Sequence, residues 1–290
     1  MTRRQFLAAC STGALLGAAA EPIIDIHQHT YYHERSDADL LAHQRGMGVT
    51  KTVLLPSGSQ YGLAAECGSN STVVAMAHAH PKEFVYFANE LPDIPEARSV
   101  LTRFLRSGAI GIGEQKFPVN VDSPAIDLVA SIAREFRVPV LMHFEHGAYN
   151  LKFTALEGLL RRYPDVNFIG HAQTWWLNIS DGADQAVLYP KTPVKPGGIS
   201  DHLLSNYPNI YGDMSAGSGL NALLRDEDHA RGFLQRHRTR LLFGSDCNDS
   251  APGTEACTGS QIIKTIRRLA DAPTARRLLY DNAAQLMKIS

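Results

Sequence analysis

The stretch Ile23-Ile24-Asp25-Ile26-His27-Gln28-His29 decides how the rest of the chain is interpreted. A short apolar run rich in β-branched residues is typical of a strand buried on both faces, and this run ends in two histidines one residue apart. Because side chains alternate along a strand with period two, His27 and His29 are expected on one face. Two such imidazoles can share a metal ion, or they can form a hydrogen-bonded pair in a core. Other ligands elsewhere in the chain must decide between the two.

Composition limits the class of protein. The chain has 290 residues, a length that an α/β barrel fills as one domain. Its 28 Lys and Arg nearly balance its 29 Asp and Glu, and its aromatic residues are not interleaved with basic clusters. This pattern argues against a nucleic-acid surface or a polybasic membrane patch, so we expect a small-molecule substrate as the partner. With 44% hydrophobic residues and no repeat of fixed period, the chain is predicted to be globular.

The first twenty residues differ from the rest of the chain. Arg3 and Arg4 precede a run of apolar and small residues that ends at Ala20, which is the order of a twin-arginine export signal. We expect cleavage after Ala20, export to the periplasm and a mature barrel domain over residues 21–290; without export the protein would be cytoplasmic. The apolar run is too short to span a bilayer, so no stable membrane span is expected. A lipoprotein site at Cys10 and an uncut N-terminal arm are the alternatives.

The cysteines stand at positions 10, 67, 247 and 257. Removal of the first leaves an odd number, which does not suit a disulfide framework, and no pair has Cys-x-x-Cys spacing. Cys247 and Cys257 could form one bridge in an oxidising compartment. Burial as small apolar side chains is the preferred interpretation for the three.

After the first strand, short apolar runs alternate with segments of helical periodicity, which is typical of βα units around a parallel sheet. Further strands are expected over residues 52–55, 84–88, 109–114, 137–142, 166–170, 210–214 and 241–244. Helices are expected over residues 36–45, 71–78, 96–106, 124–136, 151–163, 226–238, 261–269 and 275–287. Eight strands with helices between them predict an α/β fold, a (β/α)8 TIM barrel in a single domain. Residues 174–198 lack periodicity, and we interpret them as a lid or as a contact between copies in a homo-oligomer.

Residues able to bind a metal follow several of these strands. Glu114, His143, His171 and Asp246 each end a predicted strand, as the two histidines do in the first. Singly, each is compatible with an ordinary role as a core histidine or a helix cap. Because the carboxyl ends of the strands meet at one end of a barrel, their joint occurrence favours a metal site. Nitrogen and oxygen donors without a thiolate indicate zinc, manganese or iron.

This ordered set of motifs resembles the amidohydrolase superfamily, and within it the amidohydrolase-related group that also contains metal-dependent decarboxylases and lactonases. The resemblance covers residues 22–290 and rests on the histidine pair, Glu114, His143, Phe168-Ile169-Gly170-His171-Ala172 and Phe243-Gly244-Ser245-Asp246. It implies a metal site of His27, His29, Glu114, His143, His171 and Asp246. Glu114 matches a position where some relatives place a bridging carboxylate and others a carboxylated lysine. Lys116, two residues on, is the alternative for that role.

These ligand types predict a hydrolase in which one or two divalent ions, zinc in the first place, activate water against an amide, ester, lactone or similar bond. Asp246 is assigned as the proton shuttle between the water and the leaving group. A metal-dependent decarboxylase on the same scaffold is the alternative reaction, and a non-catalytic metal-binding protein is a third hypothesis. The sequence names no substrate.

Several other polar residues near the strand ends are weaker candidates for substrate binding or for contacts to the ligands: Lys116, Glu145, His146, Gln173, Asp213, Asn248 and Asp249. Trp175 and Trp176 could line a pocket or pack beneath the long loop. His43 and the remaining histidines follow no strand end and are interpreted as surface or packing residues. Gln28 is expected to point outward against the helices.

Overall fold

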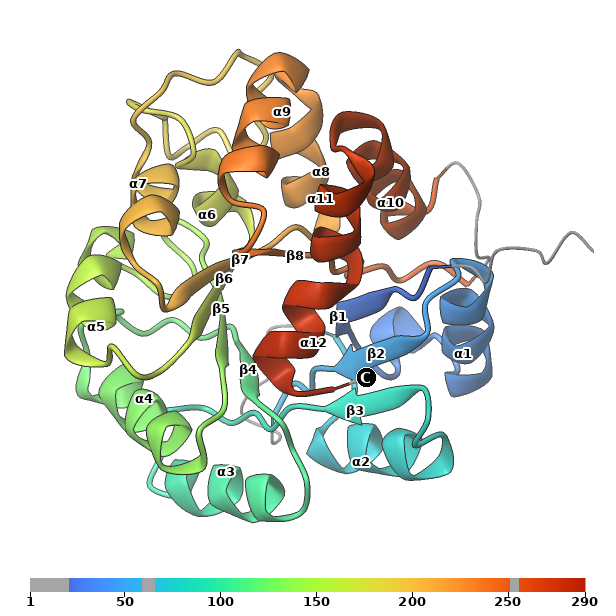
Figure 1. The fold of residues 1–290 in the computed structure, drawn as a ribbon. Coiled ribbons are helices and arrows are strands. Elements are labelled where there is room, and N and C mark those ends of the chain that lie inside the picture. Colours follow the sequence, from blue (N-terminus) through green and yellow to red (C-terminus); the bar gives the residue numbers. More distant parts are fainter. Residues whose placement is uncertain (1–20, 59–65, 251–255, 290) are drawn as a thin grey trace, which may run out of the picture.

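Eight parallel strands form the centre of the molecule, and helices surround them (Figure 1). The computed structural model describes residues 21–58, 66–250 and 256–289, so the export signal expected over residues 1–20 lies outside the described residues. The strands are β1 (Ile24–Gln28), β2 (Lys51–Leu54), β3 (Phe84–Tyr86), β4 (Ile112–Gln115), β5 (Val140–His143), β6 (Phe168–His171), β7 (Ile210–Asp213) and β8 (Leu241–Leu242).

The strands follow the order of a barrel. Three pair as β1-β2-β3 and five as β4-β5-β6-β7-β8, each parallel to its neighbour. A bridge between Ala88 and Ile112 joins β3 to β4, and the Ile26 amide donates a hydrogen bond of 3.1 Å to the Phe243 carbonyl, which joins β8 to β1. The predicted (β/α)8 TIM barrel is confirmed.

Helices cover the outside of the strands. They are α1 (Asp37–Gly46), α2 (Asn70–Ala79), α3 (Ala97–Arg106), α4 (Pro124–Phe136), α5 (Leu156–Arg162), α6 (Gln173–Leu177), α7 (Ile199–Asn206), α8 (Ala216–Leu224), α9 (Glu227–Arg236), α10 (Thr258–Leu269), α11 (Ala272–Arg276) and α12 (Asn282–Met287). Ser123 caps α4 by accepting a hydrogen bond from the Ile126 amide, and Pro124 occupies the first turn, where its missing N–H costs nothing. Within the described ranges, no helix is long and apolar enough to cross a membrane.

Some helices differ from the sequence prediction. The helix expected over residues 151–163 starts as a 3-10 turn, Phe153–Ala155, and only then becomes α5. Helices α6, α7 and α8 were not predicted. Helix α6 has five residues, too few to show a period, and α8 contains Gly217 and Gly219, which have low helix propensity. The end of the chain is split by a π-helical turn, Arg277–Asp281, between α11 and α12.

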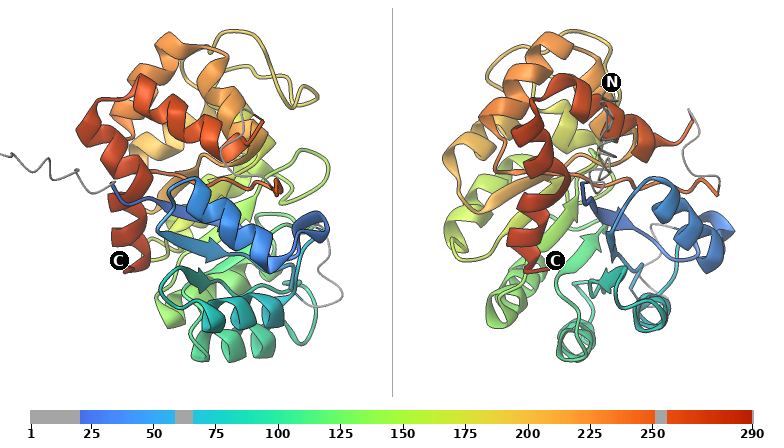
Figure 2. Two further views of the ribbon diagram at one scale, coloured as in Figure 1. Left: turned by 90° about the vertical axis from the view of Figure 1, so that its right-hand side faces the viewer. Right: turned by 45° about the vertical axis from the view of Figure 1, so that its right-hand side comes forward.

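The barrel interior is apolar at one end. Side chains from six strands or their ends pack there: Ile24, Ile26, Val53, Leu55, Phe87, Leu141, Ile169 and Leu242. Ala283 and Met287 of α12 join this cluster, so α12 closes that end. In the left view of Figure 2 the arrows of β1 and β2 point away from α12, and the loops that follow the strands gather at the opposite end. A larger apolar cluster fills the layer between strands and helices.

A bulge in β1 sets the direction of its histidines. Asp25 pairs with Thr52, whereas Gln28 pairs with Leu54, so β1 has one more residue than β2 between these pairs. A bulge of this kind resets the alternation of side chains. As a result Ile26 packs in the apolar interior and the next residue, His27, also turns toward the barrel centre.

The two tryptophans pack in the core. Trp175 is fully buried and Trp176 nearly so, and the Trp176 indole donates a 2.8 Å hydrogen bond to the Asp213 carbonyl. Gly170 makes room for Trp175, because a Cβ there would lie 2.4 Å from the ring. Packing, and not the lining of a pocket, is therefore their role.

Candidate metal centre

The two histidines of β1 present one ring nitrogen each to a common space. Their Nε2 atoms lie 3.2 Å apart. The Nδ1 of His29 lies 2.7 Å from the Leu55 carbonyl oxygen, and the Nδ1 of His27 lies 2.7 Å from Oδ2 of Asp213. Because these partners accept the Nδ1 protons, both Nε2 atoms are left free to bind a metal.

Glu114, at the end of β4, reaches different histidines with its two oxygens. Its Oε2 lies 3.6 Å from Nε2 of His27 and 3.8 Å from Nε2 of His29. Its Oε1 lies 2.6 Å from Nδ1 of His143 and 3.6 Å from Nε2 of His171. A carboxylate in this position can bridge two cations.

Asp246 closes the centre from the segment after β8. Its Oδ1 lies 3.7 Å from Nε2 of His27 and 3.5 Å from Nε2 of His29, and its Oδ2 lies 3.7 Å from Nε2 of His171. The Oδ1 atom is buried and has no hydrogen-bond partner among the described residues. Because a buried polar atom without a partner is costly, an oxygen surrounded by imidazole nitrogens fits a bound cation.

The donors fall into two groups that share His27. One consists of His27, His29 and Asp246, and the other of His27, Glu114 and His171; within each, the donor atoms lie within 4.8 Å of one another. Imidazole and carboxylate donors suit zinc, manganese or iron. The residues present therefore fit one divalent ion or two.

His143 is placed differently from the other histidines. Its Nδ1 faces Glu114, and its Nε2 lies 3.3 Å from Oε2 of Glu145, so it contacts two carboxylates and belongs to neither donor group. Its role as a ligand stays a prediction. Lys116 extends over the ring of Tyr149, 5.5 Å from the ring centre, so Glu114 is the residue of this pair that lies among the histidines.

A family model described as amidohydrolase matches residues 24–289. The chain belongs to the amidohydrolase family. No curated protein matches it. An uncharacterized TIM-barrel protein from Bordetella bronchiseptica is similar, with a TM-score of 0.64 at 17% identity over 92% of this chain and 98% of that one.

Two further solved structures share the fold of this amidohydrolase. A probable 2-pyrone-4,6-dicarboxylic acid hydrolase from Acinetobacter baumannii, with citric acid bound, has a TM-score of 0.63 at 14% identity over 92% of this chain and 99% of that one. A 5-carboxyvanillate decarboxylase from Novosphingobium aromaticivorans, complexed with manganese and a nitrobenzoic acid, has a TM-score of 0.55 at 15% identity over 86% of this chain and 79% of that one.

Asp213, which the sequence analysis predicted only as a weaker candidate, contacts two of the histidines of the centre. It ends β7, and its Oδ2 lies 2.7 Å from Nδ1 of His27 and 3.2 Å from Nδ1 of His171. The Ser215 hydroxyl donates a 2.8 Å hydrogen bond to the same oxygen. One buried carboxylate thus orients two of the histidines of this amidohydrolase. The position of Asp213 at the end of a predicted strand is the feature of the sequence that indicates this role.

Several residues that hold the strand ends were missed. Asn150 donates to the Gln115 and His143 carbonyls at 2.6 and 2.7 Å, which ties β4 to β5. Gln28 was expected to point against the helices, but it is buried and donates to the Ser245 hydroxyl at 2.7 Å and to the Cys247 carbonyl at 2.9 Å. It therefore fixes the segment that carries Asp246.

The carboxylates make the centre strongly negative. Burial lowers the pKa of His27, but Asp246, Asp213 and Glu114 outweigh burial and raise that pKa well above its usual range. Burial also lowers the pKa of His29, whereas Cys67 and Asp246 raise it to about 10. Without a cation, protons on these two rings would balance the carboxylates, and a divalent ion can take their place.

Tyr32 lies at the edge of this centre, and its involvement was also missed. Its ring centre is 4.8 Å from that of His29. The negative charge of Asp246, together with burial, raises the pKa of the Tyr32 phenol, so the hydroxyl stays protonated and can donate a hydrogen bond. Burial raises the pKa of Asp246 itself, but His27 and His29 outweigh burial and lower it to about 2.

Proposed function

We propose that the protein is a metal-dependent hydrolase that cleaves an amide, ester, lactone or similar bond in a small molecule. The observation that carries the proposal is the Glu114 carboxylate, whose two oxygens face His27 and His29 on one side and His143 and His171 on the other. Glu114 would help to hold one ion with His27 and His171, and His29 and Asp246 would hold a second with His27; two divalent ions at such a site would supply the chemistry for hydrolysis.

The side chains of this chain would perform the remaining steps. When bound, the divalent ion, zinc in our proposal, would polarise the bond under attack and lower the pKa of a water molecule. Asp246, 13% exposed and ionised at neutral pH, accepts the proton of the attacking water and passes it to the leaving group. Asp213 holds the His27 and His171 rings in orientation. We expect the Tyr32 phenol, which stays protonated beside His29, to donate a hydrogen bond to the substrate.

Decarboxylation of a carboxylic acid is the second candidate function, and one observation favours it. Burial lowers the pKa of Lys116, but Glu114 and Asp246 outweigh burial and raise it, so the ammonium stays charged beside the centre. A half-buried cation there could hold a substrate carboxylate. The 5-carboxyvanillate decarboxylase with the same fold acts on such an acid.

Product analysis separates the two functions. The purified, metal-loaded protein is incubated with a panel of lactones, esters, amides and aromatic or enoic acids, and both acid release and carbon dioxide release are measured. Acid release from the lactones, esters or amides, without carbon dioxide, is the expected result. Carbon dioxide as the product would replace the hydrolase by the decarboxylase, and full metal loading without any turnover would favour a non-catalytic protein.

Export to the periplasm is proposed from the sequence alone. Replacing Arg3 and Arg4 by lysine should leave the chain in the cytoplasmic fraction, whereas the unchanged chain should be found in the periplasm and begin at Glu21. Equal fractionation of the two forms would contradict this assignment.

A further inference from the structure

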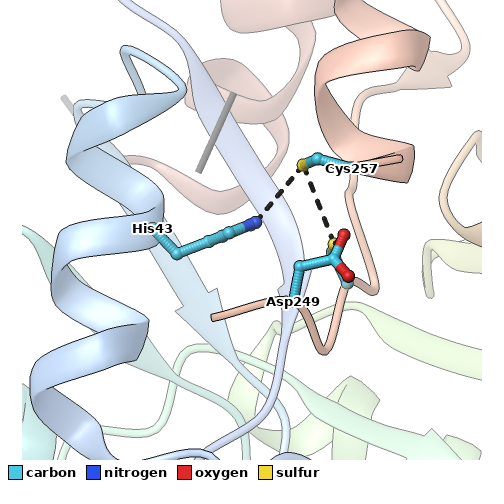
Figure 3. A group of neighbouring side chains, drawn as sticks. His43, Asp249 and Cys257 are labelled. Atoms are coloured by element: carbon cyan, nitrogen blue, oxygen red, sulfur yellow. Dashed lines mark hydrogen bonds between the residues drawn. The ribbon is translucent and has the colours of Figure 1, made fainter. Parts of the chain in front are cut away.

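A second cluster of metal-binding side chains lies outside the barrel interior. It contains His43 of α1, Cys247 and Asp249 from the segment after β8, and Cys257 at the start of α10. Figure 3 shows the His43 ring directed at Cys257, with Asp249 beside them. The four donor atoms all lie within 4.8 Å of one another. The metal centre of the barrel interior uses none of these residues.

The distances within the cluster are close to those between ligands on one ion, and two of the three shortest contacts fall within that range. The two Sγ atoms lie 3.8 Å apart, Nε2 of His43 lies 3.3 Å from Sγ of Cys257, and Oδ2 of Asp249 lies 3.0 Å from Sγ of Cys247. Bonds of about 2.3 Å to sulfur and about 2.0 Å to nitrogen or oxygen, at tetrahedral angles, separate neighbouring donors by about 3.3 to 3.8 Å. Side-chain adjustments of up to about 1 Å would bring all four donors, which lie within 4.8 Å of one another, to tetrahedral spacing.

Three of the four side chains in the cluster are buried, Asp249 is half-buried, and hydrogen bonds hold the backbone of Cys247 and Asp249. His43 and Cys257 are fully buried and Cys247 is nearly so, as in structural metal sites without an open position. The Cys247 carbonyl accepts hydrogen bonds from Arg35 at 2.7 Å and from Gln28 at 2.9 Å, and Arg35 also donates to the Asp249 carbonyl at 3.1 Å. These contacts hold the segment that carries Cys247 and Asp249 without the help of an ion.

Neither a disulfide nor simple burial accounts for the two thiols as well as an ion does. A disulfide requires an S–S distance of about 2.05 Å, and the sulfurs are 3.8 Å apart. Burial as apolar side chains does not account for the imidazole and the carboxylate that accompany them. The Met47 thioether lies 3.6 Å from Sγ of Cys257 and makes copper(I) the rival ion.

We propose that His43, Cys247, Asp249 and Cys257 form a second metal site that binds zinc and has a structural role. Each thiol releases its proton to solvent when it binds the ion. The ion would link α1, the segment after β8 and the start of α10, and one of its ligands, Cys247, directly follows Asp246 in the chain. Only a packing role was predicted for His43, because its partners lie more than two hundred residues away along the chain and no Cys-x-x-Cys pair marks them.

Zinc content in a background without the first centre tests the site. The full chain carrying His27→Ala and His29→Ala is purified without chelator and analysed by mass spectrometry of metals. We expect one zinc per chain to remain, and Cys257→Ser in the same background to remove it. Met47→Leu, a matched change in the same pocket, should keep it. Equal zinc content with and without Cys257→Ser would overturn the proposal, as would copper that disappears with Met47→Leu.

The absorption spectrum of the cobalt-loaded protein tests the site even if Cys257→Ser fails to fold, because it is measured on the unchanged chain and on Asp249→Asn. Cobalt-loaded protein should show a thiolate-to-cobalt charge-transfer band, and Asp249→Asn, which keeps the side-chain size and both thiols, should shift this band and weaken cobalt binding at least tenfold. An absent band would contradict the site. So would a free-thiol count in denatured, unreduced protein that is two below the number of cysteines in the purified chain, four with the first twenty residues and three without them, since that count indicates a disulfide. Neither experiment depends on the proposed hydrolysis.

Discussion

The two ends of the barrel interior are built from opposite chemistry. At the end closed by α12, Ile24, Leu141, Ile169 and Leu242 pack with Met287. At the other end the strands of the barrel finish in imidazoles and carboxylates, most of them buried, and Oδ1 of Asp246 has no hydrogen-bond partner among the described residues. Apolar burial stabilises the fold, whereas buried charge costs stability unless an opposite charge balances it. The apolar end therefore stabilises the barrel, whereas the polar end gives up stability for side chains that can bind a cation.

Replacement of Asp246 should have the largest effect on the polar end. Asp246→Asn removes the proposed proton acceptor but preserves the size of the side chain, so we expect kcat to fall by about 10³-fold with little change in the melting temperature. Activity and thermal unfolding are measured on the same preparation. Normal kcat in a folded variant would show that Asp246 does not transfer the proton.

Truncation of a side chain at the apolar end should lower the stability of the fold and leave catalysis unchanged. Ile169→Ala leaves a cavity beside Leu141 and Leu242, and we expect a loss of about 2–5 kcal/mol in the free energy of unfolding. Metal content per folded chain and kcat should stay the same, as judged by denaturant unfolding and metal analysis. Loss of metal in the folded fraction would mean that the two ends are not independent.

Asp213 tests whether orientation of the histidines matters. Asp213→Asn keeps the shape but withdraws the charge from His27 and His171, so metal affinity should fall by about 10- to 100-fold. Metal-buffer titration measures the affinity, and Tyr211→Phe on the same strand is a control that should leave it unchanged. An unaltered affinity in Asp213→Asn would reduce its role to packing.

Metal binding at the polar end should depend on pH, because its histidines carry protons that the metal must displace. The pKa of His27 is raised well above its usual range and that of His29 to about 10, so both rings carry protons below these values and must lose them to bind a metal. Metal affinity should therefore rise as pH increases, by up to about 100-fold per pH unit where two protons are released. Affinity that is constant between about pH 6 and about pH 8, a range that begins near the usual histidine pKa of about 6.5 and lies below the raised values, would contradict this linkage.

The fold could be predicted because local patterns determine it. Apolar runs predicted all eight strands, and Ser123-Pro124 predicted the start of α4. Helix α8 was missed because packing overrides the low helix propensity of its glycines. The β1 bulge is set by its pairing with β2, which no local pattern shows.

The candidate site was predictable in its parts but not in its arrangement. The rule that strand ends meet brought His27, His29, Glu114, His171 and Asp246 together on one end of the barrel, as the structure places them. The position of His143 between Glu114 and Glu145, and the hydrogen bonds of Asp213, depend on side-chain geometry that strand order does not specify. The cluster around His43 depends on contacts between α1 and the far end of the sequence.

Metal content of the Glu114→Ala variant tests the central claim most directly. If the Glu114 carboxylate bridges two ions at the barrel mouth, the variant should contain one metal equivalent less per chain than the unchanged protein and should lose most of its activity. The second site near His43 contributes equally to both proteins and cancels in the difference. Unchanged metal content together with near-normal activity would contradict the two-metal hydrolase.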